Sequence, residues 1–223
     1  MKKLIQKVMV FLLVSAMLIT SGVFAANREI WAASARVYIS PYSYTVVTYK
    51  PGDDCKEYYS TIKIMGCTKA SEIKNLKSSN KNMKAKAGDG YVIVYYGDKA
   101  QKTTITCTVK GVKLKTTLTV KKYTNPAKSV KIGKTNLTAD FKNTNICRTA
   151  KKTYKNQKLD IKLKSGWKIR AVSVYSEGKL KNYSNINRTE FSKKVTIRGN
   201  YSYIYIQCVN EKTKITETLS IMI

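Results

Sequence analysis

The residue types that most often perform catalysis are scarce in this chain. Its 223 residues include no histidine, which excludes triads built on an imidazole and zinc sites that need histidine ligands. The 13 acidic residues are scattered, so neither a facing carboxylate pair nor a calcium site is indicated. Ser-x-x-Lys spacing occurs at Ser71 with Lys74 and at Ser78 with Lys81, but chance supplies it in so lysine-rich a chain. We therefore expect no enzyme, no metal and no cofactor.

Basic side chains supply the strongest binding chemistry. The chain has 42 lysine and arginine residues and a formal net charge of +29. Charge of that sign attracts anions over about 8 to 10 Å at ordinary salt. The candidate anion-binding residues are Lys113, Lys115, Lys151, Lys152, Lys155, Lys158, Lys162 and Lys164. The alternative is that these lysines only keep solvent-facing strands in solution and protect strand edges from pairing.

Sixteen tyrosines form the second unusual group. Tyr201, Tyr203 and Tyr205 alternate along one expected strand, where they could stack on sugar rings or contact a protein partner. Ile204 and Ile206 occupy the other face of that strand, and we assign this face to the core. The tyrosines then lie either on the surface or between two modules. A second set lies in the N-terminal half of the chain: Tyr42, Tyr44, Tyr49, Tyr58, Tyr59, Tyr95 and Tyr96.

The chain has five cysteines, at positions 55, 67, 107, 147 and 208. An odd number leaves at least one unpaired within a monomer. Cys107 and Cys208 are in phase with core residues, so each could be a small buried apolar side chain. Bridges from Cys67 to Cys107 and from Cys147 to Cys208 are the alternatives to free thiols.

The elements that must position these residues are β-strands. Runs rich in β-branched and aromatic residues recur at short intervals, and apolar residues alternate with lysine or threonine within them. The expected strands are 37–39, 45–49, 59–65, 91–96, 103–109 and 112–120, then 129–132, 159–163, 169–175, 194–197, 203–209 and 215–221. No stretch between them carries an amphipathic helix, so the sequence predicts an all-β protein of two adjacent sandwiches.

Turn-forming residues in the sequence predict where one module ends and the next begins. The segment 123–126, Tyr-Thr-Asn-Pro, interrupts two β-like stretches and is typical of a short linker. We therefore place one domain at 36–122 and the other at 126–223. Lys110 and Gly111 predict a tight hairpin turn within the first domain, because glycine tolerates the positive φ that such turns require.

The first 25 residues are typical of a secretory signal peptide. A basic start precedes the apolar run 8–19, and a small-residue cleavage site ends at Ala25. This run is short for a membrane span, which needs about 20 residues. We expect cleavage after Ala25, with Ala35 as the alternative. The mature protein would then be secreted, and either extracellular or loosely associated with the cell wall.

The first domain resembles a known family. The segments that carry the resemblance are 73–81 (IKNLKSSNK), 90–94 (GYVIV) and 102–109 (KTTITCTV). They are similar to bacterial immunoglobulin-like domains of the group 2 type, although Leu76 stands where the family usually has Trp and Lys102 stands near its usual Gly. The resemblance implies two tandem immunoglobulin-like β-sandwich modules, the second more divergent. It also implies a role in adhesion, spacing or accessory binding, and it names no ligand.

The high positive charge, the sets of tyrosines and the resemblance to bacterial immunoglobulin-like domains together favour one function. This is a non-catalytic binding or adhesion protein with a basic surface. The expected partners are anionic cell-wall polymer or acidic glycans, with another surface protein as a further candidate. Export makes nucleic acid an unexpected partner. The alternative function is a structural spacer or accessory protein that has no strong ligand of its own.

Overall fold

The computed structural model describes residues 36–54, 57–149, 153–199 and 201–223. The expected signal peptide, Cys55, Lys151 and Lys152 lie outside the described residues. In the described ranges, the helical segments are two short 3-10 turns, η1 (Ala70–Glu72) and η2 (Ala139–Phe141), and none is long and apolar enough to span a membrane. Strands make up the other regular structure, which confirms the predicted all-β class.

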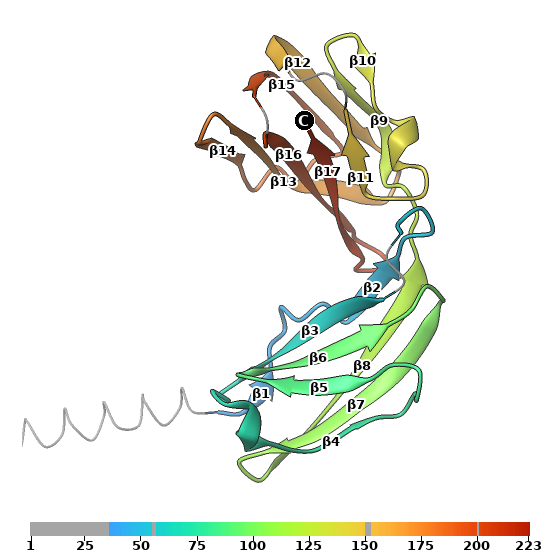
Figure 1. Ribbon diagram of the computed structural model, residues 1–223, viewed down its shortest axis with the longest axis vertical. Helices are drawn as coiled ribbons and strands as arrows, with labels where there is room; N and C mark the ends of the chain where they lie inside the picture. The colour runs from blue at the N-terminus through green and yellow to red at the C-terminus, as the bar shows by residue number, and fades with distance from the viewer. Residues whose placement is uncertain (1–35, 55–56, 150–152, 200) are drawn as a thin grey trace, which may run out of the picture.

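The first sandwich consists of two four-stranded sheets, drawn in blue to green in Figure 1. Its strands are β1 (Tyr38–Ile39), β2 (Val46–Tyr49), β3 (Tyr58–Met65), β4 (Ile73–Ser78), β5 (Ala85–Gly88), β6 (Tyr91–Tyr96), β7 (Gln101–Val109) and β8 (Val112–Lys122). The strand order is β1-β3-β6-β5 in one sheet and β2-β8-β7-β4 in the other. If β1 and β2 are taken as two parts of strand A, then β3 to β8 are strands B to G. The two sheets then have the A-B-E-D and C-F-G arrangement of the immunoglobulin fold.

The second sandwich repeats this plan with two changes, a short added strand and one strand that has changed sheet. Its strands are β9 (Ala127–Ile132), β10 (Thr135–Asn136), β11 (Ile146–Arg148), β12 (Thr153–Leu163), β13 (Trp167–Ser176), β14 (Lys179–Tyr183), β15 (Glu190–Arg198), β16 (Tyr203–Asn210) and β17 (Thr216–Met222). The sheets are β10-β9-β12-β15 and β11-β17-β16-β13-β14. Here β14 pairs with β13, whereas the corresponding β5 pairs with β6, so this strand has changed sheet. The two modules are therefore tandem immunoglobulin-like sandwiches, as predicted.

The alternation of apolar and polar residues along each strand decides which of its faces is buried. In β16, Ile204, Ile206 and Cys208 are fully buried, which confirms the predicted core face. Between β7 and β8, Lys110 and Gly111 have φ values of 47° and 80°, the paired positive angles that a tight hairpin turn requires. The predicted hairpin is confirmed.

Each sandwich has its own apolar core. The first core is built around aliphatic side chains such as Ile62, Val94 and Leu118. The second contains more buried residues, among them Phe141 and Trp167. The sequence patterns missed the short strands β4, β5, β10, β11 and β14, and β12 begins well before the expected residue 159.

Four cysteines are free and buried in these cores: Cys67, Cys107, Cys147 and Cys208. Neither of the two predicted alternative bridges is formed. Both sandwiches instead use these thiols as small apolar side chains.

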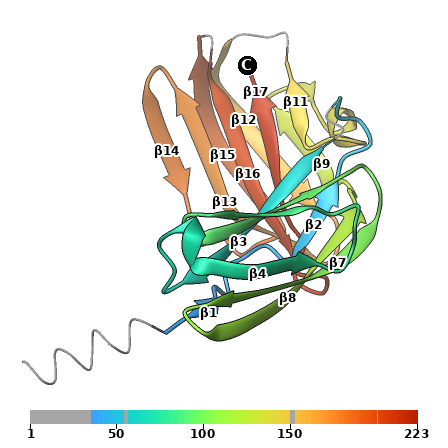
Figure 2. The same cartoon turned by 60° about the horizontal axis from the view of Figure 1, so that its bottom comes forward.

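The sandwiches meet end to end, and the hairpin between β16 and β17 reaches β2 (Figures 1 and 2). On that hairpin the Glu217 carboxylate is 3% exposed, accepts a hydrogen bond from the Thr48 hydroxyl and lies 3.5 Å from the Lys50 ammonium. The Gly52 N–H donates to the Asn143 carbonyl at 3.0 Å. Polar contacts therefore bind the two modules to each other.

The linker is also anchored. Tyr123, at the predicted boundary, is buried in the second core and donates its hydroxyl to the Phe141 carbonyl at 3.1 Å. Its own N–H donates to the Tyr49 carbonyl of β2 at 2.9 Å. One residue therefore joins the linker to both sandwiches.

Candidate functional site

The predicted residues Lys113 and Lys115 lie on β8, where both are exposed. They point outward because Leu118 and Val120 of the same strand fill the core. Across the antiparallel ladder, Lys113 lies opposite Thr108 of β7, and Lys115 opposite Thr106. Each ammonium group therefore has a hydroxyl group as its neighbour on the same face of the sheet.

Three further lysines extend this surface. Lys74 and Lys77 of β4 pair with Thr108 and Thr106 from the other side of β7, and Lys102 lies on β7 itself. All three are exposed. We call this surface the lysine–threonine face, and its residues are Lys74, Lys77, Lys102, Lys113, Lys115, Thr104, Thr106, Thr108 and Thr117.

The lysine–threonine face carries positive charge only. The strands β2, β4, β7 and β8 contain no aspartate or glutamate. Neighbouring strands lie about 4.8 Å apart and alternate residues along a strand about 6.6 to 6.8 Å apart, so the side chains form a regular grid. An anionic chain crossing this grid would meet several cations and hydroxyl donors and no acidic side chain from these strands.

Two lysines predicted on the second sandwich have a different environment. Lys158 and Lys162 lie on β12, and their ammonium groups lie 3.3 Å from Asp160 and 3.4 Å from Glu190. Exposed ion pairs of this kind contribute about 0 to 1 kcal/mol to stability. They also cancel locally the charge that an anionic ligand would contact.

The remaining predicted lysines do not complete one surface. Lys155 near the start of β12 and Lys164 just after its end are exposed, while Lys151 and Lys152 lie outside the described residues. The structure thus divides the predicted set between β8 of the first sandwich and β12 of the second.

The predicted tyrosines form a stack that includes one unexpected member. Tyr203 and Tyr205 of β16 have ring centroids 4.3 Å apart, and Tyr175 of β13 stacks on Tyr203 at 4.9 Å. Tyr201 precedes the strand and is 89% exposed. Tyr175 is brought to this place by the pairing of β13 with β16, which alternation along a single strand does not reveal.

Two of the buried thiols are held in their protonated form. Burial raises the pKa of the Cys147 and Cys208 thiols to about 12, so both stay protonated near neutral pH. Among the described residues, no group of three or more cysteine or acidic side chains is placed to hold a metal ion.

Comparison with known proteins finds similar solved structures but no relative by sequence. No family model matches it, and no curated protein matches its sequence. Similar solved structures include the Clostridium thermocellum CbhA fibronectin(III)-like modules (13% identity, 84% of this chain, 94% of that chain, TM-score 0.29) and the titin Ig tandem domains A164-A165 (12%, 83%, 95%, 0.28). Bovine butyrophilin is similar at 8% identity, over 84% of this chain and 97% of that chain, with a TM-score of 0.28. Because these TM-scores are low, the immunoglobulin-like assignment rests on strand order.

Proposed function

We propose that this protein is a secreted or cell-surface, non-catalytic binding protein that attaches to anionic cell-wall polymer or acidic glycans. Its units are the domains 36–122 and 126–223, and the first is a bacterial immunoglobulin-like domain of the group 2 type. The lysine–threonine face is the surface that makes the attachment. The polymer supplies phosphate or carboxylate groups, and the lysines and threonines supply ammonium and hydroxyl donors.

The observation that carries this proposal is the absence of acidic residues from the strands of that sheet. A single exposed lysine–anion contact is worth only about 0 to 1 kcal/mol. A polymer with repeated anionic groups makes several such contacts at once on a rigid sheet, which multiplies affinity without a new conformational cost for each one. The contacts are exposed, so salt weakens them.

The packed junction favours a second function, that of a structural spacer. Glu217, Lys50 and Tyr123 bind the two sandwiches to one another and to the linker. Such a junction holds two modules at a fixed angle, as a spacer requires. In this case the lysines serve only to keep the protein in solution.

The test is binding of the full chain to peptidoglycan that carries teichoic acid and to the same wall stripped of it, over a salt series. We expect retention on the first wall only, with affinity that falls steeply as salt rises. The variant K113E/K115E should lose most of this retention, because it reverses two charges on the acid-free sheet.

The matched control is K179E/K212E, which makes the same change in net charge at exposed positions on the second sandwich. It should bind nearly as well as the unmodified chain. Equal losses in the two variants would show that net charge alone governs binding. No retention on either wall would favour the spacer.

A further inference from the structure

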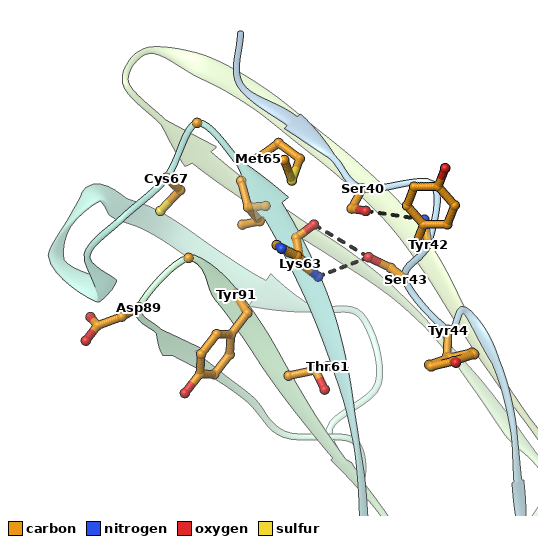
Figure 3. Close-up of a pocket in the computed structure, with 13 residues that line it drawn as sticks. Ser40, Tyr42, Ser43, Tyr44, Thr61, Lys63, Met65, Cys67, Asp89 and Tyr91 are labelled. Atoms are coloured by element: carbon orange, nitrogen blue, oxygen red, sulfur yellow. Dashed lines mark hydrogen bonds between the residues drawn. The ribbon is translucent and has the colours of Figure 1, made fainter. Parts of the chain in front are cut away.

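A hollow lies on the sheet of the first sandwich that contains β3, opposite the sheet that carries the lysine–threonine face. Figure 3 shows the residues that line it. Its floor is the outer face of β3, where Thr61, Lys63 and Met65 point outward because Ile62 and Ile64 fill the core. The hollow has a volume of about 480 Å³. It is therefore large enough to hold part of a small organic ligand.

Tyrosines form both walls of this hollow. Tyr42 and Tyr44, from the connection between β1 and β2, stand on one side and are 89% and 53% exposed, while Tyr91 of β6 stands on the other. The Tyr91 ring lies against Gly88 of β5, so close that a Cβ at position 88 would be 2.2 Å from the ring. Because Gly88 has no side chain, the Tyr91 ring can pack directly against the backbone of β5.

The wall that carries Tyr42 and Tyr44 is held in place by hydrogen bonds to β3. The Lys63 N–H donates to the Ser43 hydroxyl at 3.0 Å, and the Ser40 N–H donates to the Lys63 carbonyl at 2.9 Å. The Ser60 hydroxyl donates to the Tyr44 carbonyl at 3.0 Å. A ligand would therefore meet a wall whose backbone is already ordered, which lowers the entropic cost of binding.

A second hollow, of about 310 Å³, continues the first toward the junction. The two share Tyr44 and Thr61, and the second adds Tyr59, which is 67% exposed. Asn145 and Thr218 of the second sandwich complete its lining. Because they share lining residues, we treat the two hollows as one groove along β3, where the strand from Tyr59 to Met65 is roughly 20 Å long.

The groove has no net charge. The first hollow contains one cation, Lys63, and one acid, Asp89. In the second, Lys50 already pairs with Glu217. What the groove offers a ligand is a series of aromatic faces together with hydroxyl and amide groups, in contrast to the cationic sheet on the other side of the same sandwich.

We propose that this groove binds a linear, uncharged polysaccharide. A sugar ring has a C–H face that packs on an aromatic ring and a rim of hydroxyls that hydrogen-bond to serine, threonine and asparagine. Exposed tyrosines spaced along an extended groove suit a chain of such rings. This site is separate from the proposed attachment to anionic polymer and does not depend on it.

The experiment is affinity electrophoresis of the full chain in gels containing β-glucan, mannan or xylan, at low and at high salt. We expect retardation by at least one of the three, to the same extent at both salt concentrations because no charge is neutralised. Tyr44→Ala and Tyr59→Ala should each weaken it about tenfold, as loss of an aromatic contact commonly does. Both side chains are largely exposed, so melting temperatures should stay unchanged.

Three further variants sharpen the test. Leu180→Ala removes an apolar side chain of the second sandwich that is 56% exposed and should change nothing, and K113E/K115E should also leave retardation intact. Gly88→Ala should weaken binding, because its Cβ displaces the Tyr91 ring while Gly88 is not among the glycines with positive φ.

Several outcomes would overturn the proposal. They are no retardation in any of the three gels, retardation that disappears at high salt, and equal retardation of Tyr44→Ala and the unmodified chain. Dimerisation that Tyr44→Ala abolishes, without polysaccharide binding, would assign the groove to a second copy of the protein instead.

Discussion

The two sandwiches share a fold and use their aromatic residues differently. The first exposes Tyr42, Tyr44 and Tyr59 along a groove and has a small core of mainly aliphatic residues. The second buries Phe141 and Trp167 in a larger core and exposes Tyr201 and Tyr205 at and beside β16. Burial of large side chains is the main source of stability, so we expect the second sandwich to support the structure and the first to do most of the recognition.

The same contrast holds for charge. In the first sandwich the lysines of one sheet have no acidic neighbour along its strands, whereas in the second Lys158 and Lys162 are in ion pairs. A module whose exposed groups lack partners within the fold keeps them available for ligands. The comparison suggests a general point. Two copies of one fold in a chain can serve for ligand binding or for structural support, depending on whether their exposed charged groups have partners within the fold.

The largest expected effect comes from the two cores. Leu118 and Leu219 are fully buried, one in each sandwich, and replacing either by alanine should cost about 2 to 5 kcal/mol. In a Trp31→Phe background Trp167 is the single tryptophan, and its fluorescence reports unfolding of the second sandwich. Leu219→Ala should lower the denaturant midpoint of this signal more than Leu118→Ala does. Equal shifts would show that the two modules unfold as one unit.

A smaller effect is expected at the linker. Tyr123→Phe removes the hydroxyl that donates to the buried Phe141 carbonyl and leaves that oxygen without this bond. The loss should be about 1 to 3 kcal/mol in the stability of the second sandwich. Urea denaturation followed by Trp167 fluorescence measures it. An unchanged midpoint would mean that Tyr123 contributes by packing alone.

The smallest effect concerns pH. Burial raises the pKa of Glu217 above its ordinary value of 4.5, although the Lys50 charge and the Thr48 hydroxyl favour the ionised form. The folded state then binds this proton more tightly than the unfolded state, so its contribution to stability falls as the pH rises from 4.5 toward the folded pKa. Glu217→Gln removes this titration and should flatten the pH dependence, by at most about 1.4 kcal/mol per pH unit. The measurement is the free energy of unfolding of both proteins at a series of pH values. If the interpretation is wrong, Glu217→Gln will show the same slope of unfolding free energy against pH as the unmodified chain.

Local pattern was enough to predict most of the fold. Alternation in 103–109 and 112–120 identified strands, their buried faces and the outward direction of Lys113 and Lys115. Strands without that signal were missed: β5 is Ala-Lys-Ala-Gly, and β11 has only three residues. Such strands are fixed by pairing with neighbours rather than by their own composition.

The two proposed binding surfaces depend on strand pairing even more strongly than the fold does. Lys74 and Lys77 join Lys113 and Lys115 only because β4 and β8 both pair with β7. The groove needs Tyr44, Tyr59 and Tyr91 from three segments that are distant in sequence. One-dimensional periodicity holds no information about which strands become neighbours, so these surfaces were not predictable from it.

The parallel pairing of terminal strands has a mechanical consequence. In each sandwich a strand near the start of the module, β2 or β11, runs parallel to its last strand, β8 or β17. Tension applied between the ends of a module then pulls these two strands along their length in opposite directions. All the hydrogen bonds between them carry the load together and must break at once, whereas a hairpin pulled from its open end would unzip one bond at a time. We therefore expect each module to resist unfolding when tension is applied between its two ends.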